Sequence, residues 1–200
     1  MPEFRPWAKI ARLNRDCIIT EKIDGTNAAV GVTEDGEVYA QNRTKIITPA
    51  GDNHGFAAWV EAHADVLRET LGVGLHFGEW WGKSINRGYK QSAKRFSLFN
   101  VKRFGPALRR PADGVYGITF EDDTVLDIVP ILYEGPFLTD MVEAELRDLV
   151  IDGSVAAPGY SYPEGLVVYH TAARVAFKVT IENDQYHKGE EAKYHKGEAN

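Results

Sequence analysis

The sequence predicts an α+β fold with largely antiparallel sheets and flanking helices. Nine short runs rich in β-branched and aromatic residues are separated by turn residues, and only two segments have the periodicity of a helix. Many strands with a few interspersed helices are typical of this class. The 200 residues contain no linker rich in Gly, Ser or Pro, so we expect one domain over residues 1–185 and a polar tail over 186–200.

Three strands are predicted in the first quarter of the chain. Residues 17–21 contain consecutive β-branched side chains, and the Asp-Gly pair at 24–25 predicts a tight turn after them. Residues 28–33 and 38–41 follow, separated by turn residues at 34–36. Two strand-like runs joined by so short a connection predict a β-hairpin.

Two helices are predicted, the first over residues 56–71. Its core-facing residues recur at three- and four-residue spacing and share one face: Phe56, Trp59, Val60, His63, Val66 and Leu67. Gly72 and Gly74 follow where the pattern stops, and glycine commonly ends helices. The second helix is expected to run from Thr139, whose hydroxyl suits an N-cap, to Val150.

The remaining strands are predicted from short apolar runs between turn residues. Their ranges are 75–80, 95–101, 116–120, 125–133, 165–170 and 174–179. The tail contains the repeat YHKGE at 186–190 and 194–198, and two copies are too few to form a solenoid. We therefore expect the tail to be a polar extension of the domain.

Composition excludes several classes of protein. Cys17 is the only cysteine, so the chain has neither an intrachain disulfide nor a cysteine-based zinc site. The N-terminus lacks the apolar stretch of a signal peptide, and no apolar run reaches membrane-spanning length. We expect a cytoplasmic protein that has no membrane partner and needs no obligate protein partner.

The positive charges are unevenly distributed. The net charge of −6 does not favour binding to nucleic acid, but nine of the 23 Lys and Arg residues lie between positions 83 and 110, where Asp and Glu are absent. Aromatic residues at 89, 96, 99 and 104 are interleaved with them. Such a segment is typical of a surface that faces nucleic acid. The alternative is that these cations keep one helix and one strand soluble.

The stretch EKIDGTN at residues 21–27 carries the first candidate site. Lys22 stands where a predicted strand gives way to a turn, so its amine can project from the rim of a sheet into a cleft. Asp24, Thr26 and Asn27 add oxygens and an amide that suit a phosphate, a metal ion or closure of the turn. Taken alone, the same residues also fit an ordinary turn with a solvated lysine.

Three further stretches place single charged residues among apolar ones. Glu79 lies in GEWWG, Glu164 opens a strand in PEGLVV, and Lys178 interrupts AFKVT. An isolated charge is unfavourable to bury, so each of these residues needs a partner or a function. A mutual ion pair between Glu164 and Lys178 is the purely structural alternative.

Five stretches resemble, in order, motifs I, III, IIIa, IV and V of the covalent nucleotidyltransferases, which comprise DNA ligases, RNA ligases and mRNA capping guanylyltransferases. They are EKIDGTN, FGEWWGKSINRGY, FSLFNV, PEGLVVY and AFKVT, and they span residues 22–180. GEWWG followed by INRGY is most similar to the phage and RNA-editing branch of the ATP-dependent RNA ligases. The resemblance implies an adenylation domain with a central nucleotide cleft. Because only about twenty residues follow Lys178, we expect no OB-type or other C-terminal domain.

The resemblance also implies a role for each matching residue. The catalytic residues are expected to be Lys22, which takes AMP from ATP, together with Glu164 and Lys178. Glu79 is expected at the ribose hydroxyl and Phe99 on the adenine ring. The full set of expected nucleotide contacts is Glu21, Asn27, Arg43, Glu79, Phe99 and Lys178. Asp24 and Glu164 suit Mg²⁺ or Mn²⁺, because magnesium prefers few carboxylates together with phosphate oxygens and water. The expected nucleic-acid contacts are Lys83, Arg87, Lys90, Lys94 and Arg95.

These expectations describe an ATP-dependent RNA ligase, which passes AMP from Lys22 to an RNA 5′-phosphate and joins that end to a 3′-hydroxyl. The alternatives are a capping-type guanylyltransferase, a DNA ligase, or a non-catalytic relative that binds nucleotide or RNA. Two departures favour the non-catalytic alternative: Asn100 replaces the usual Asp after Phe99, and Thr180 replaces a second lysine. The acids and lysines central to the chemistry are all present, which favours an enzyme.

Overall fold

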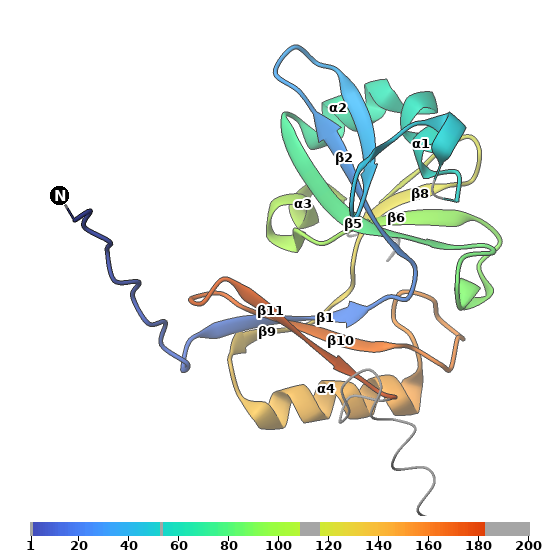
Figure 1. Cartoon of the computed structure of the whole chain (residues 1–200). Coiled ribbons are helices and arrows are strands. Elements are labelled where there is room, and N and C mark those ends of the chain that lie inside the picture. The colour runs from blue at the N-terminus through green and yellow to red at the C-terminus, as the bar shows by residue number, and fades with distance from the viewer. Residues whose placement is uncertain (1, 53, 109–116, 183–200) are drawn as a thin grey trace, which may run out of the picture.

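Two β-sheets and four α-helices make up the fold in a computed structural model, which describes residues 2–52, 54–108 and 117–182. The smaller sheet lies beneath the larger one in Figure 1, and the chain crosses between them directly after β1. Within the described ranges only β6 and β8 pair in parallel. The predicted α+β class with largely antiparallel sheets is therefore confirmed.

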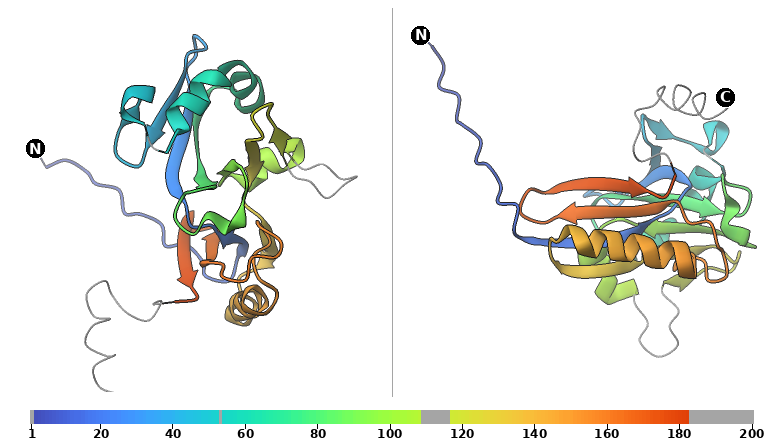
Figure 2. Two further views of the ribbon diagram at one scale, coloured as in Figure 1. Left: turned by 90° about the vertical axis from the view of Figure 1, so that its right-hand side faces the viewer. Right: turned by 90° about the horizontal axis from the view of Figure 1, so that it is seen from below.

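The smaller sheet has four strands, and the ends of its two central strands form one side of the candidate site. Its order is β11 (Val175–Thr180), β10 (Gly165–His170), β1 (Asp16–Lys22) and β9 (Ile131–Pro136). Helix α4 (Thr139–Asp152) packs against β9 and β10, as the right-hand view of Figure 2 shows. One face of the sheet is thus covered by α4, and the opposite face is turned toward the larger sheet.

The larger sheet has seven strands and supplies the other side of the site. Its order is β4 (Ile46–Ile47), β3 (Val38–Asn42), β2 (Thr26–Val32), β5 (Gly74–Gly82), β6 (Lys94–Leu98), β8 (Val125–Ile128) and β7 (Ile118–Thr119). The predicted hairpin is present as β2 and β3. Since β1 and β2 belong to different sheets, residues 23–25 connect the two halves of the fold.

The predicted helix over residues 56–71 is two helices. These are α1 (Phe56–Ala62) and α2 (Ala64–Leu71), and they pack on β2 and β3. His63 lies between them with φ −115° and ψ 21°, outside the helical region, which interrupts the helix. Gly72 ends α2 with a φ of 66°, as predicted.

Three other predictions need correction. The strand predicted over 95–101 ends at Leu98, and a third helix, α3 (Val101–Leu108), follows and packs on β8. The strand predicted over 125–133 is divided into β8 and β9, because the chain leaves the larger sheet at residues 129–130 and enters the smaller one. The N-cap of α4 is Leu138 rather than Thr139, and its side chain makes no capping hydrogen bond. Tyr116 and the YHKGE repeats lie outside the described residues.

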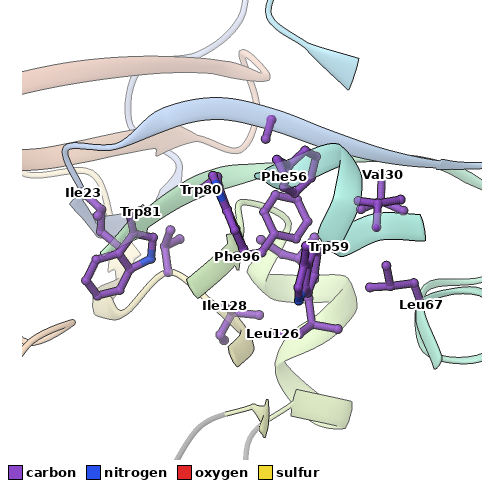
Figure 3. Packing of buried hydrophobic residues seen from close by; sticks show 14 of the residues in the cluster. Ile23, Val30, Phe56, Trp59, Leu67, Trp80, Trp81, Phe96, Leu126 and Ile128 are labelled. Carbon is purple, nitrogen blue, oxygen red and sulfur yellow. The ribbon is translucent and has the colours of Figure 1, made fainter. Parts of the chain in front are cut away.

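Aromatic rings fill the core between the larger sheet and α1. Phe56, Trp59, Trp80 and Phe96 are buried, and their ring centroids are 5.0–5.8 Å apart. Figure 3 shows these rings converging from α1, β5 and β6. Such clusters add specific edge and stacking contacts to the burial of apolar area. The core therefore fixes β5, whose C-terminal half carries Glu79.

The chain before β1 forms an arm without helix or strand. Residues 2–12 extend away from both sheets in Figure 1, and Phe4, Trp7 and Ile10 are at least 86% exposed.

Two short 3₁₀ segments complete the secondary structure: η1 (Pro49–Gly51) and η2 (Gly88–Lys90). Among the helices that the structure describes, none has the length and apolar character needed to span a membrane.

Candidate active site

Lys22 and Glu164 meet at the rim of the smaller sheet. Lys22 is the last residue of β1 and pairs with Gly165, the first residue of β10, so that Glu164 lies directly beside it. The Lys22 Nζ donates a hydrogen bond to Glu164 Oε2 at 2.5 Å, and both side chains are about one-quarter to one-fifth exposed, at 24% and 21%. Glu164 pairs with Lys22, so the predicted alternative of a Glu164–Lys178 ion pair is wrong.

Glycine is required at position 165, where β10 begins beside β11 directly after Glu164. Its φ is +150°, and a Cβ there would lie 2.2 Å from the carbonyl oxygen of Val179. Only glycine adopts such a conformation without strain, and it allows close approach of the neighbouring backbone. The sequence Glu164-Gly165 thus sets the carboxylate at the mouth of the strand.

Glu79 reaches the same region from the larger sheet. It is opposite Asn27 in the β2–β5 pairing and accepts hydrogen bonds from Asn27 Nδ2 at 3.1 Å and from the Gly25 backbone N–H at 3.0 Å. Burial raises the pKa of Glu79 to about 7, although nearby Lys22 and the Gly25 N–H favour its charged form. A carboxyl group whose pKa is shifted by burial inside a cleft is typical of a functional site.

A polar cavity of about 540 Å³ lies between these groups. Its volume is in the range of small-molecule sites. Five predicted site residues line it, namely Lys22, Asp24, Asn27, Arg43 and Glu79. Gly25, Thr26, Asn42 and Thr44 complete the lining. The structure thus brings together residues from β1, β2, β5 and the end of β3.

A smaller and more apolar cavity of about 150 Å³ adjoins the first. Both cavities share Asn27, Asn42 and Arg43, and the smaller one is also lined by Phe77 and Phe99. The remaining lining residues are Ala28, Ala29 and Gln41. Phe99 is 45% exposed, so a face of its ring is open to a flat ligand.

Lys178 shares the cleft face of the smaller sheet with Lys22. Lys178 is opposite Val167, which is opposite Thr20, and residues directly opposite one another in paired strands lie on the same face. Thr20 and Lys22 share a face because side chains alternate along a strand. Lys178 is exposed and lies outside the lining of the larger cavity.

Glu21 is turned to the opposite face and does not line either cavity. Its buried carboxylate accepts hydrogen bonds from Ser154 Oγ at 2.6 Å and from the Ala156 N–H at 2.7 Å. Burial raises the pKa of Glu21, although these hydrogen bonds favour the charged form. Alternation along β1 explains this placement, because consecutive residues of a strand point to opposite faces. The structure gives the Glu21 carboxylate a role in joining β1 to the segment after α4.

Asp24 is held by the loop between β5 and β6. Its Oδ2 accepts a hydrogen bond from Arg87 Nε at 3.1 Å, and its Oδ1 accepts one from Asn86 Nδ2 at 3.0 Å. The Tyr89 hydroxyl accepts a hydrogen bond from the Asp24 N–H at 2.9 Å. The sequence did not identify Asn86 and Tyr89 as residues of the site, because their partner, Asp24, is more than sixty residues away along the chain.

The charges around the cavity leave an excess of cations. Glu164 balances Lys22, and Arg87 balances Asp24. Among the described residues, Arg43 and Lys178 have no ion-pair partner. With Glu79 titrating near neutral pH, the surroundings of the cavity suit an anion with several charges.

The residues predicted to contact nucleic acid are in different environments. Lys83 and Lys90 are exposed on the loop between β5 and β6. Arg95 directs its guanidinium at Asp127, with an Nη2–Oδ2 distance of 2.5 Å, and Lys94 donates to the backbone oxygen of His54 at 2.7 Å. The structure gives the side chains of Arg95 and Lys94 these internal contacts, and Lys83 and Lys90 face solvent.

Carboxylates that could hold a metal ion are few near the cavity. In the three ranges that the structure covers, no group of three or more His, Cys, Asp or Glu residues is arranged as a metal site. Glu164 has a partly exposed carboxylate at the rim, whereas both oxygens of Asp24 already accept hydrogen bonds. Glu164 therefore fits a metal ion that has substrate oxygens and water as its other ligands.

Comparison with known proteins supplies the family context of this site. The family model described as RNA ligase matches residues 15–180. No curated protein matches the sequence. Solved structures of Naegleria gruberi RNA ligase are similar in fold. A mutant with ATP and Mn has a TM-score of 0.60 at 19% identity over 88% of this chain and 53% of that chain. The complex with PPi has a TM-score of 0.58 at 18% identity over 90% and 57%.

A second mutant with ATP and Mn has a TM-score of 0.57 at 19% identity over 84% of this chain and 49% of that chain. The present chain thus spans about half the length of the solved structures that it matches. The matched region includes both sheets and every residue that lines the two cavities.

Proposed function

The chain belongs to the RNA ligase family, and from this premise we propose that it is an ATP-dependent RNA ligase that forms a covalent lysyl-AMP at Lys22. The observation that carries the proposal is the position of the Lys22 amine. It lies at the rim of a polar cavity, 2.5 Å from Glu164 and on the same sheet face as Lys178. This is the arrangement that a nucleophile at a bound triphosphate requires.

In the first step the Lys22 nitrogen forms a bond to the α-phosphorus of ATP, and the bond from that phosphorus to the oxygen of pyrophosphate breaks. Pyrophosphate leaves with the electron pair. The ammonium group must lose a proton before it can attack, and Glu164 is the nearest proton acceptor. Arg43 and Lys178 stabilise the charge that develops on the phosphate oxygens.

The two cavities suit different parts of the nucleotide. The larger, polar cavity suits the ribose and phosphates, with Glu79 at a ribose hydroxyl. The smaller cavity suits the adenine ring, with the exposed face of Phe99 as a stacking surface. Asn27 and Arg43 line both cavities and so stand at the junction between base and phosphates.

A divalent cation is expected, since the related structures contain Mn with ATP or AMP. Glu164 is the residue that would hold Mg²⁺ or Mn²⁺ together with oxygens of the substrate and water. When bound, the cation would neutralise charge on the triphosphate. Asp24 is better assigned to the loop that holds it than to direct ligation.

We assign the chain to the phage and RNA-editing branch on its GEWWG and INRGY stretches. In the second step AMP passes from Lys22 to an RNA 5′-phosphate, and in the third a 3′-hydroxyl displaces AMP. Lys83 and Lys90 are exposed on the loop between β5 and β6 and are proposed to contact the phosphates of the RNA.

Labelling with α-labelled nucleotide tests the first step. Wild-type protein with ATP and Mg²⁺ should retain the label after denaturation, whereas GTP and NAD should give little, and Lys22→Ala should give none. Lys102→Ala is the matched control, because Lys102 is an exposed lysine on α3 and should label like the wild type. Retention of the label in Lys22→Ala would overturn the assignment of the nucleophile.

End-joining assays test the substrate class. Matched nicked duplexes of RNA, DNA and hybrid composition, each with a 5′-phosphate, should be sealed when the reacting ends are RNA. Discrimination of that kind requires contacts to the 2′-hydroxyl. A protein that labels on Lys22 but seals DNA ends as fast as RNA ends would contradict the proposed substrate.

A further inference from the structure

Arg87 contacts three separate segments that surround the candidate site. Its Nε donates a hydrogen bond to Asp24 Oδ2 at 3.1 Å, and its Nη1 donates one to the backbone oxygen of Tyr162 at 3.1 Å. Its Nη2 lies 3.7 Å from Glu182 Oε2. The side chain is 28% exposed, so most of its surface is in contact with protein.

Two of the three partners of Arg87 lie close in the sequence to residues of the proposed chemistry. Asp24 is two residues after Lys22, and Tyr162 is two residues before Glu164. Arg87 belongs to the loop after β5 of the larger sheet, whereas Tyr162 precedes β10 of the smaller sheet. The guanidinium therefore connects the two sheets across the cleft in which Lys22 and Glu164 meet.

The loop that carries Arg87 is itself held in one conformation. Asn86 and Tyr89 have φ values of 45° and 48°, which are uncommon for residues other than glycine. Their contacts offset the energetic cost of this backbone conformation. Asn86 donates a hydrogen bond to Asp24, and the buried Tyr89 ring packs against Trp81 and Tyr160. A loop fixed in this way can hold the guanidinium at a defined place.

We propose that Arg87 is a positioning residue that, through Asp24 and the Tyr162 carbonyl, sets the geometry of Lys22 against Glu164. The inference rests on the proposed adenylation of Lys22. Asp24 acts as the acceptor for Arg87 rather than as a metal ligand, and Arg87 acts within the protein rather than on RNA phosphates. Arginine suits this task because its planar guanidinium holds donors on three nitrogens in a fixed geometry, whereas lysine has its three donors on a single nitrogen.

A double-mutant cycle tests the inference. Arg87→Lys, Asp24→Asn and the double variant are compared with wild type in single-turnover formation of lysyl-AMP over a range of ATP concentrations. Each single variant should slow the step at saturating ATP by about tenfold or more, because small misplacement of reacting groups is costly. The concentration of ATP at half-saturation should change by less than about threefold. The double variant should be no slower than the slower single variant, because both substitutions break one contact.

Arg68→Lys is the matched control, because Arg68 also binds a carboxylate, Asp65, and a backbone oxygen, that of Gly36, and none of these three residues lines either cavity. It should adenylate at the wild-type rate. Thermal unfolding of each variant separates positioning from folding, since a folded but slow Arg87→Lys supports the inference. A wild-type rate in folded Arg87→Lys, or multiplicative effects in the double variant, would overturn it while leaving the proposed function intact. Absence of lysyl-AMP in the wild type would overturn both.

Discussion

Glu79 is a residue whose charge state depends strongly on the fold. It lies in the larger sheet with 8% of its surface exposed, and burial raises its pKa from 4.5 to about 7. Between these two values the folded protein holds a proton that the unfolded chain releases. The contribution of Glu79 to the free energy of unfolding is therefore fully present below pH 4.5 and is lost as the pH rises toward 7.

Replacing Glu79 with Gln should flatten the dependence of stability on pH. Over the interval from 4.5 to 7 the wild type should lose about 3 kcal/mol of unfolding free energy relative to Glu79→Gln. Urea unfolding at a series of pH values measures the difference. Glu61→Gln, at an exposed position on α1, provides the control and should follow the wild type. If the free energy of unfolding had the same pH dependence in wild type and in Glu79→Gln, the pKa of Glu79 would not be raised in the folded protein.

Sequence analysis at the residue scale identified most of the cavity lining. Lys22, Asn27 and Glu79 were predicted because they lie in the motifs, Arg43 was implied by the same resemblance, and all four line the larger cavity. The partners of the Glu21 side chain were not predictable in the same way. A motif gives the position of a residue in the chain, whereas the partners Ser154 and Ala156 exist only after the sheet has formed.

Strands β6 and β8 are joined by an ion pair within the larger sheet. Asp127 on β8 has a side chain that is 6% exposed, and it accepts hydrogen bonds from Arg95 and from Ser97 Oγ on β6. Burial raises the pKa of Asp127. The positive charge of Arg95 and the hydrogen bonds from Arg95 and Ser97 act in the opposite direction and lower this pKa. This arrangement supports the parallel pair at which the chain leaves the sheet toward β9.

Asp127→Ala should destabilise the protein by about 3 to 5 kcal/mol, because it leaves the Arg95 charge without its partner in a largely buried place. Urea unfolding monitored by tryptophan fluorescence measures the change. Glu134→Ala removes an exposed partner of Lys102 and should cost less than about 1 kcal/mol. Equal effects of the two substitutions would contradict the structural role given to Asp127.

Helix α3, which the sequence did not predict, depends on a single residue. Asn100 accepts a hydrogen bond from the Arg103 N–H at 3.2 Å and so starts α3, in a stretch whose aromatic residues predict a strand. The departure of Asn100 from the family pattern thus has a structural role in this chain. Strands β1, β2, β3, β5, β10 and β11 were predicted closely, because their apolar runs are bounded by turn residues.

The whole molecule is a pair of sheets whose interior strands together assemble one site. Lys22 and Glu164 are 142 residues apart in the sequence, and Glu79 comes from the opposite sheet. The order of the motifs predicted that these residues belong together, but the contacts of Arg87 across the cleft could not be predicted from order alone. They depend on how the loop after β5 folds back over Asp24.

Adduct formation at Lys22 should therefore require the folded molecule. The chain has eleven lysines, and only Lys22 combines a place at the cavity with a carboxylate at 2.5 Å among the lysines that the structure describes. In urea the sheets separate, and Lys22 becomes an ordinary lysine. Reactivity confined to one lysine would thus report on the assembled site rather than on local sequence.

The most direct test is peptide mapping by mass spectrometry after incubation with ATP and Mg²⁺, in buffer and in urea. We predict one AMP per chain, attached to Lys22, in buffer, and no adduct in urea. An adduct on another lysine, or none on the folded protein, would contradict the account.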